Sequence, residues 1–267
     1  MRVNDREAIL ELAVEAATKA GDILRSGLHD PEKDESAKSH RNDPVTKYDH
    51  RADEAIGSVL LETLPDIPIV SEEAPGTASA DVCRWVVDPL DGTTNFVCGL
   101  PHFCVSIALV EPDGTTVACI HDPIRRETFA ALRGRGATVN GSPLAVSRRA
   151  TLDRAAIGVG LSHQPLRRQA VHAVLPTLYP SARCLRVSGS AALDLAYVAA
   201  GRLDAAWYAS LSEWDVAAGS LLVHEAGGRV TALSGSPLIR PDSEGVLATN
   251  GRIHRAMLDV VSGSLPL

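Results

Sequence analysis

The sequence predicts a mixed α/β fold in which an antiparallel sheet is followed by an α/β portion. Between residues 103 and 144, apolar runs are separated by Asp113-Gly114 and Asn140-Gly141, two dipeptides that favour tight hairpin turns. After residue 150, short apolar runs alternate with stretches of helical periodicity, which is typical of α/β proteins. The chain has 267 residues, 45% of them hydrophobic, and can bury a large core.

Two helices are expected ahead of the first strands. Asn4 and Glu7 have the spacing of a capping box, and apolar residues then recur at helical spacing up to Gly27. A polar segment follows, and its Asp43-Pro44 step favours a turn or extended chain. A second helix is expected from about Thr46 to Leu64, where a proline ends it.

Short apolar runs predict the strands. In the first half they cover residues 67–71, 84–88, 103–110, 115–120 and 128–132. In the second half, strands at 155–161, 183–187, 205–208 and 228–232 alternate with helices at 167–178, 191–200 and 214–226. The change of pattern predicts two subdomains, an N-terminal one over 1–150 with the antiparallel sheet and a C-terminal α/β one over 151–267.

Composition excludes several classes of protein. The formal net charge of -7 argues against a general nucleic-acid binder, because such proteins need a surplus of Lys and Arg. The five cysteines are odd in number and lack metal-finger spacing, so we expect free thiols in a reducing compartment. We find no apolar signal core and no run approaching the roughly 18 apolar residues of a membrane span. A cytoplasmic enzyme acting on a small molecule is therefore expected.

The most informative segment is residues 85–95, Trp-Val-Val-Asp-Pro-Leu-Asp-Gly-Thr-Thr-Asn. It is an apolar strand that ends in two carboxylates, Asp88 and Asp91. These two side chains can share cations, because Mg²⁺ prefers oxygen ligands and binds through a few carboxylates together with substrate phosphate oxygens. The backbone carbonyl of Leu90 lies between them and can complete a metal shell. A lone Asp-Gly pair is most often a surface turn, but the second acid and the preceding strand weaken that interpretation.

The residues after Asp91 suit a phosphate. Gly92, Thr93 and Thr94 offer consecutive amides and hydroxyls, which can bind phosphate oxygens if they open a helix. A pair of threonines taken alone is more often a helix cap. The combination of metal ligands and phosphate ligands in one segment is what favours a phosphate site.

Three further acidic positions can join this cluster only through the fold. Glu72-Glu73 follows a predicted strand and reaches the same sheet edge if that strand is a neighbour, although such a pair is usually a solvated loop feature. Asp49 lies in the first turns of a helix, where an acidic side chain stabilises the helix whether or not it has another role. If Asp49 faces the cluster, it can also accept the proton of Thr93 and help to orient a water. Asp215 also lies in the first turn of a predicted helix, so it can either stabilise that helix or join the acidic cluster.

Taken together, four blocks in this order resemble the inositol monophosphatase family of lithium-sensitive, magnesium-dependent phosphatases. The blocks are 43–49, 72–73, 88–95 and 214–219 with 225–228, and the match runs from about residue 38 to 228. The resemblance implies a layered αβαβα sandwich of the sugar-phosphatase type. It also implies a homodimer, since most relatives are dimers, and it places most of the metal ligands in the N-terminal subdomain.

The resemblance implies a role for each matching residue. Two or three Mg²⁺ ions would be bound by Glu73, Asp88, the Leu90 carbonyl, Asp91 and Asp215. Water would be activated with the help of Asp49, Thr93 and Glu73. The phosphate would be held by Gly92, Thr93 and Thr94, and the rest of the substrate by Arg186, Gly189, Ser190, Ala191, Tyr208 and Asp215, with Lys38 near the mouth. The expected reaction is hydrolysis of a small phosphate monoester of the inositol 1-phosphate type by water, without a covalent intermediate.

One position departs from the family pattern. Family members that use inositol phosphate well usually carry a glutamate seven residues before the position of Asp215, and this chain has Tyr208 there. A phenol can hydrogen-bond but lacks the charge of a carboxylate. Histidinol phosphate, fructose 1,6-bisphosphate and adenosine 3',5'-bisphosphate are therefore alternative substrates. A regulatory member that keeps the fold and binds a partner without catalysis is the alternative from another class.

Overall fold

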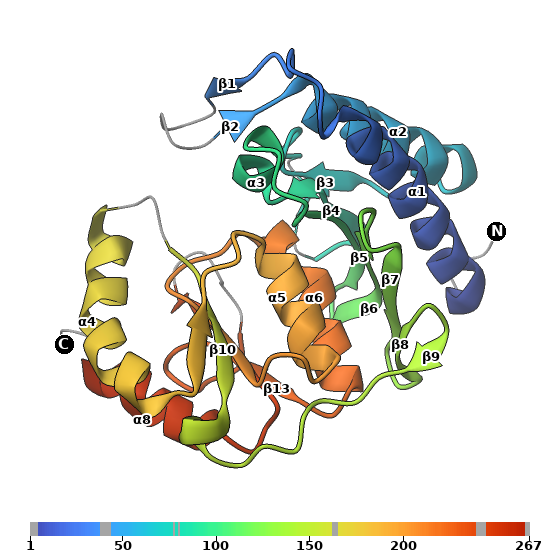
Figure 1. Ribbon diagram of the computed structural model, residues 1–267. Helices are drawn as coiled ribbons and strands as arrows, with labels where there is room; N and C mark the ends of the chain where they lie inside the picture. Colours follow the sequence, from blue (N-terminus) through green and yellow to red (C-terminus); the bar gives the residue numbers. More distant parts are fainter. Residues whose placement is uncertain are drawn as a thin grey trace.

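The computed structural model describes residues 5–37, 44–76, 78–79, 81–161, 165–238 and 244–264. Its helices and sheets form five layers in the order αβαβα (Figure 1), which confirms the predicted fold class. Helices α1 (Arg6–Gly27) and α2 (Lys47–Thr63) form the first layer, against one face of a seven-stranded sheet. Helices α5 (Ala191–Ala199) and α6 (Glu213–Glu225) lie between that sheet and a five-stranded one.

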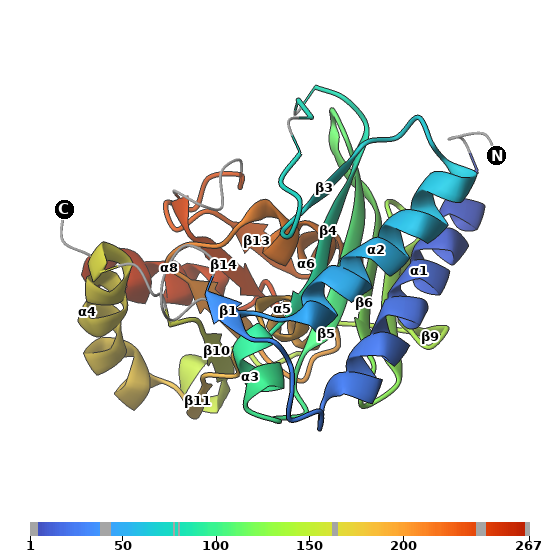
Figure 2. The ribbon, with the colours of Figure 1, turned by 90° about the horizontal axis from the view of Figure 1, so that it is seen from above.

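The last layer covers the outer face of the second sheet. It consists of α4 (Pro165–Ser181) and α8 (His254–Ser264), which pack on the apolar side chains of that face. Seen from above, these two helices lie at the opposite side of the molecule from α1 and α2 (Figure 2). Among the described residues, no helix combines the length and the apolar character that crossing a bilayer requires.

The seven-stranded sheet follows chain order, as the hairpin signals predict. Its strands are β3 (Ile69–Ser71), β4 (Arg84–Asp91), β5 (Cys104–Glu111), β6 (Gly114–Asp122), β7 (Glu127–Leu132), β8 (Gly136–Val139) and β9 (Ser142–Pro143). Only β3 and β4 run parallel, and every later pair is antiparallel. Asn140 and Gly141 both have positive φ, 48° and 77°, as a two-residue hairpin turn requires.

The five-stranded sheet has the order β11-β10-β12-β14-β13. Its strands are β10 (Ala156–Val159), β11 (Cys184–Arg186), β12 (Ala205–Tyr208), β13 (Arg229–Thr231) and β14 (Val246–Thr249). β10 runs parallel to both of its neighbours, and β14 antiparallel to both of its own. Neither β14 nor α8 was predicted. The seven-stranded sheet contains only strands that precede residue 150, and the five-stranded sheet only strands that follow it. Helices α5 and α6 pack against both sheets, so the division into subdomains stays a prediction.

Four short elements complete the fold, and the start of α1 can be compared with its predicted cap. The short elements are β1 (Ser36–Ala37), β2 (Pro44–Val45), α3 (Thr93–Val97) and the 3₁₀ turn η1 (Leu152–Arg154). The capping box predicted from Asn4 and Glu7 was wrong. Asp5 caps α1 instead, because the helix begins one residue later and the Asp5 carboxylate accepts the Ala8 amide at 3.3 Å; Asn4 lies outside the described residues.

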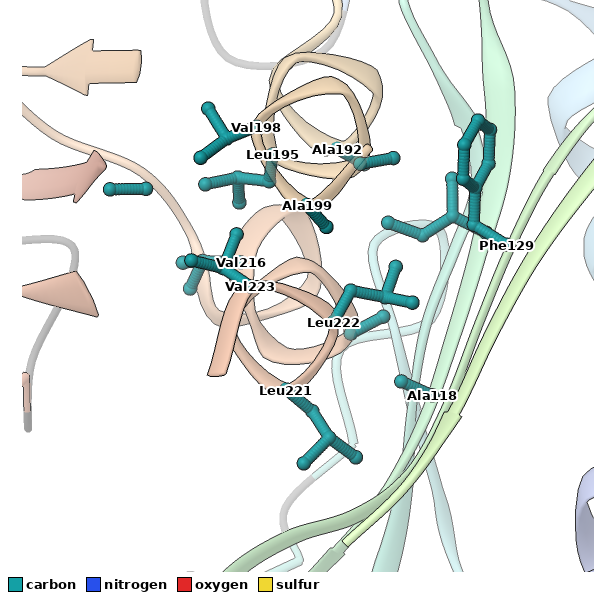
Figure 3. Close-up of a cluster of buried hydrophobic side chains, with 14 of the residues drawn as sticks. Ala118, Phe129, Ala192, Leu195, Val198, Ala199, Val216, Leu221, Leu222 and Val223 are labelled. Atoms are coloured by element: carbon teal, nitrogen blue, oxygen red, sulfur yellow. The ribbon is translucent and has the colours of Figure 1, made fainter. Parts of the chain in front are cut away.

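The middle layer is built from small residues so that α5 and α6 can approach closely. Figure 3 shows their side chains between the sheets, with Phe129 and Ala118 of the first sheet on one side. At Gly219 of α6, a Cβ atom would lie only 2.5 Å from the Cβ of Leu195 on α5. This contact therefore requires glycine, and it holds α6, which carries Asp215 in its first turn, against α5.

Candidate metal centre and active site

The fold brings together three of the predicted acids. Asp88 and Asp91 lie at the end of β4, where the pairing with β5 is interrupted by a shift in register, and Asp215 lies in the first turn of α6. One carboxylate oxygen from each lies within 4.8 Å of the others. Asp88 and Asp91 are buried and Asp215 is partly buried. Residues 127 positions apart in sequence thus form one cluster of oxygen ligands.

This cluster is electrostatically costly on its own. Burial raises the pKa of Asp88 well above its usual value, and the negative charges of Glu72 and Asp91 raise it further. The pKa of Asp215 is raised well above normal by burial and by the same two neighbours. A divalent cation would reverse this local charge, and an all-oxygen set suits Mg²⁺ rather than a softer metal. The residues present therefore fit the metal that the sequence predicts.

Asp91 is oriented by the N-terminus of α5. Its Oδ2 accepts the Ser190 hydroxyl at 2.5 Å and the Ala192 amide at 2.7 Å, and its Oδ1 accepts the Ala191 amide at 3.3 Å. These hydrogen bonds lower the pKa of Asp91 and oppose the increase caused by burial. Ser190 and Ala191, which the sequence assigned to the substrate, thus contact a predicted metal ligand directly.

The two neighbouring glutamates occupy different environments. Glu73 Oε2 lies 3.8 Å from Nδ1 of His50, and the Glu73 side chain is only 5% exposed. It is the charge of Glu72 that raises the pKa of both Asp88 and Asp215. The sequence analysis named the Glu72-Glu73 pair and assigned the ligand role to Glu73, and that assignment stays a prediction. The register of the sheet is the signal for Glu72: Ser71 pairs with Val87 in parallel, which places the next residue level with Asp88.

Thr93 and Asp49 meet as the sequence suggests. Thr93 Oγ1 lies 3.2 Å from Asp49 Oδ1 and 3.0 Å from the Leu90 carbonyl oxygen. Its single proton can serve only one of these acceptors at a time. Asp49 is buried, and its Oδ2 accepts the amide and the hydroxyl of Thr46, the N-cap of α2, at 2.8 and 2.7 Å. The cap of α2 therefore fixes the orientation of Asp49.

A pocket of 430 Å³ opens beside the carboxylates. Its lining includes Asp91, Asp215 and several residues predicted to bind the substrate: Gly92, Thr93, Thr94, Gly189, Ser190, Ala191 and Tyr208. A larger, open groove of 840 Å³ borders α6 and β13, but its described lining includes no member of the carboxylate cluster. The smaller pocket is therefore the candidate active site.

Two of the predicted substrate contacts, Arg186 and Tyr208, form hydrogen bonds to other parts of the protein. Arg186 is exposed, and its guanidinium donates to the Leu185 carbonyl at 2.9 Å instead of forming part of the pocket wall. Tyr208 does line the pocket, but its hydroxyl donates to Oδ2 of Asp194 at 2.7 Å. Lys38 and Asp43 lie outside the described residues.

The five-layer fold and the oxygen-only carboxylate cluster match a known class of protein. The model of the inositol monophosphatase family matches residues 5–264, and the chain belongs to this family.

Individual relatives resemble the chain over nearly its whole length. The Nus factor SuhB of Xylella fastidiosa is 40% identical over 263 residues, which cover 96% of this chain and 94% of the relative. The crystal structure of the extragenic suppressor protein suhB from Bartonella henselae covers 97% of this chain and 100% of its own, with 36% identity and a TM-score of 0.92. The inositol monophosphatase from Anabaena (Nostoc) sp. PCC 7120 shares 35% identity, covers 98% of both chains and has a TM-score of 0.86.

Proposed function

We propose that the protein is a phosphoric monoester hydrolase that uses Mg²⁺ to hydrolyse a small phosphate monoester of the inositol 1-phosphate type. The observation that carries this proposal is the cluster of Asp88, Asp91 and Asp215, which lies beside a pocket lined by Asp91, Asp215, Thr93 and Thr94. Membership of the inositol monophosphatase family supports it. The related substrates histidinol phosphate, fructose 1,6-bisphosphate and adenosine 3',5'-bisphosphate remain alternatives within the same chemistry.

The metal would be held by residues from both halves of the chain. The proposed ligands are Asp88, the Leu90 carbonyl, Asp91 and Asp215, together with Glu73 as predicted from the sequence and Glu72 as its electrostatic coupling suggests. When bound, Mg²⁺ supplies Lewis acidity and neutralises charge on the phosphate and on the leaving oxygen. The hydrogen bonds from Ser190 and Ala192 fix the Asp91 carboxylate in advance, which preserves its geometry when the metal is absent.

Proton transfer would depend on Thr93 and Asp49. The Thr93 hydroxyl donates to Asp49, so its oxygen lone pairs can accept a hydrogen bond from the attacking water and orient it toward phosphorus. Asp49 is buried and fixed by Thr46, so it can take up the proton passed on by Thr93 without a change of rotamer. In this proposal Gly92, Thr93 and Thr94 hold the phosphate, and Glu73 assists the activation of water.

Phosphate release from a panel of esters tests the proposal. The panel contains inositol 1-phosphate, histidinol phosphate, fructose 1,6-bisphosphate and adenosine 3',5'-bisphosphate, each with Mg²⁺ or with a chelator. We expect Mg²⁺-dependent turnover, and we expect Asp88→Asn to lower its rate by more than about 100-fold. Losing a residue that only hydrogen-bonds to a metal ligand typically lowers activity by about 10–100-fold, so losing a ligand itself should cost more. Asp113→Asn changes an exposed acid of the β5–β6 turn and serves as the control. Turnover that survives both chelation and Asp88→Asn would contradict the proposed mechanism.

A second candidate function follows from the names of the relatives. Several curated relatives are called Nus factor SuhB, a name that describes no phosphatase activity. This favours a regulatory member that binds a partner as the alternative. The acidic cluster favours catalysis, because a protein without metal chemistry gains nothing from burying like-charged carboxylates next to one another. Absence of turnover of every ester, together with no binding of Mg²⁺, would favour the regulatory function.

Two finer properties accompany the proposal. We propose that the protein forms a homodimer and that lithium inhibits it, as the family resemblance implies. Sedimentation velocity at micromolar concentration distinguishes a dimer from a monomer. Phosphate release measured with increasing LiCl, against NaCl at equal ionic strength, tests the inhibition separately.

A further inference from the structure

We propose that the ion pair between Arg84 and Glu213 positions the Asp215 carboxylate for the metal. The inference rests on the proposed function, because it concerns how the same carboxylate cluster is held in place. Among the described residues, neither Arg84 nor Glu213 belongs to the cluster or to the lining of the pocket. Both are therefore positioning residues, which act on the metal only through Asp215.

The ion pair joins the two elements that carry the cluster. Arg84 is the first residue of β4, the strand that ends with Asp88 and Asp91, and Glu213 is the first residue of α6, two positions before Asp215. Nη2 of Arg84 donates to Oε1 of Glu213 at 2.6 Å. The two residues are 129 positions apart in sequence, so this contact forms only when the strand and the helix pack together.

The two partners of the pair differ in exposure. The Arg84 side chain is only 6% exposed, whereas the Glu213 side chain is 40% exposed and borders the open groove beside α6. A buried guanidinium is costly without a carboxylate partner, so the fold gains by keeping Glu213 in contact with it. Since β4 is paired with a strand on each side, Arg84 is the fixed partner, and the start of α6 is held to it.

A second contact attaches the same turn of α6 to the sheet. The hydroxyl of Ser106 on β5 donates to the Trp214 carbonyl at 3.2 Å, and Ser106 is the residue that pairs with Asp88 across the two strands. Within the turn, Asp215 accepts the Ser212 amide at 2.7 Å. A single attachment would allow the turn to pivot, whereas the hydrogen bond and the ion pair together restrain it.

The need for this restraint comes from the metal. Mg²⁺ requires nearly ideal octahedral geometry, so a small displacement of one carboxylate weakens its binding. Residues that orient a metal ligand from outside typically change affinity or activity by about 10–100-fold. The ion pair acts on one ligand of several, and we therefore expect its loss to weaken Mg²⁺ binding by about tenfold, at the lower end of this range.

A matched pair of variants tests the inference. Glu213→Gln removes the carboxylate that faces Arg84, and Arg149→Gln removes the guanidinium that faces Asp204, in an ion pair next to the start of β12 and remote from the cluster. In both cases the changed residue is partly exposed, 40% and 38%, and the buried partner stays. Both variants should lower the midpoint of thermal unfolding by several degrees. Only Glu213→Gln should weaken Mg²⁺ binding, measured by calorimetry.

Tryptophan fluorescence provides a readout that needs neither metal nor turnover. Trp214 lies between Glu213 and Asp215 and is partly exposed, whereas Trp85 and Trp207 are fully buried. Quenching by acrylamide therefore reports mainly on the first turn of α6. In the metal-free protein, Glu213→Gln should raise the quenching constant about twofold, because the turn loses one attachment, and Arg149→Gln should leave it unchanged.

A double variant separates positioning from stability. Arg84→Met combined with Glu213→Gln removes the buried charge together with its partner, so it should regain stability relative to Glu213→Gln alone. If the ion pair positions Asp215, this double variant should still bind Mg²⁺ about tenfold more weakly than the wild type. Because Glu213 is partly exposed, Glu213→Gln remains informative even if the double variant fails to fold.

The outcomes separate this inference from the proposed function. A change in the Mg²⁺ dissociation constant of Glu213→Gln below about threefold, which is less than the usual effect of such a partner, overturns the inference and leaves the phosphatase intact. Mg²⁺ affinity that recovers together with stability in the double variant also overturns it. If the wild type binds Mg²⁺ but hydrolyses no ester, the proposed function fails, and the calorimetric and quenching data still decide the inference. A wild type that binds no Mg²⁺ overturns both.

Discussion

At the scale of single residues, the site consists of carboxylates in surroundings that oppose their charge. Burial raises the pKa of Asp88, Asp91 and Asp215, and it also raises that of Asp194, which lies behind the substrate pocket. These groups weaken the metal-free fold at neutral pH. Surface positions would carry the same charges at almost no cost, so the burial of the Asp88, Asp91 and Asp215 carboxylates supports the proposal that they bind a cation.

Asp194 leads to a prediction about pH. Burial raises its pKa from 3.8 to about 7, so between about pH 4 and 7 the folded state binds more protons than the unfolded state. Stability should therefore fall as pH rises through this window, by at most about 4 kcal/mol for a shift of about three pKa units. Asp194→Asn keeps an acceptor for Tyr208 but cannot ionise, so urea unfolding should show a flatter pH profile. Equal profiles for the two proteins would contradict the assignment.

At the scale of elements, the site depends on how helix starts are placed. The α2 cap Thr46 orients Asp49, the first turn of α5 binds Asp91, and the first turn of α6 carries Asp215. The α5–α6 contact at Gly219 then sets the separation of two of these helix starts. Small shifts between these two helices would therefore disturb the distance between Asp91 and Asp215.

Gly219→Ala tests this contact. The added methyl would lie 2.5 Å from Leu195 Cβ, and overpacking of this kind typically costs about 1–3 kcal/mol. We expect a lower midpoint of thermal unfolding and weaker binding of Mg²⁺, since Asp215 moves with α6. Gly57→Ala, inside α2 with no atom within 4 Å of the new methyl, is the matched control and should stabilise the protein by about 0.5–1 kcal/mol. If both variants behave alike, the contact does not constrain the site.

At the scale of the whole molecule, the carboxylate cluster joins separate parts of the fold. Asp88 and Asp91 come from the seven-stranded sheet, and Asp215 comes from the helical layer between the sheets. A cation bound by all three therefore links these layers. Because such a cation would bind only the folded state, it would also stabilise the fold by mass action.

Thermal unfolding with and without Mg²⁺ measures this link. At 100 times its dissociation constant, Mg²⁺ should stabilise the protein by about 2.7 kcal/mol, which corresponds to roughly 5–10 °C in the midpoint. Asp88→Asn should abolish this response. In the metal-free state the same variant should melt above the wild type, because one member of the like-charge cluster has been neutralised. A wild-type midpoint that is insensitive to Mg²⁺ would exclude the cluster as a cation site.

Local patterns in the sequence determined much of this protein. The apolar run before Asp88, the hairpin turn at Asn140-Gly141 and the helical periodicity of α1 and α2 depend on neighbouring residues, so they predicted the elements within a few positions. Strand β14 and helix α8 were missed, since their short apolar runs carry no distinctive signal and acquire their structure from packing on the second sheet.

Only the tertiary structure decided which side chains meet. The parallel register of β3 and β4 places Glu72 level with Asp88, and the charge of Glu72 adds to the effect of burial in raising the pKa of Asp88. The packing of α5 against β12 brought Asp194 of the helix to the Tyr208 hydroxyl, which donates to it at 2.7 Å. The physical reason is that local sequence sets backbone preferences over a few residues, whereas these contacts join positions that come together only when the layers pack.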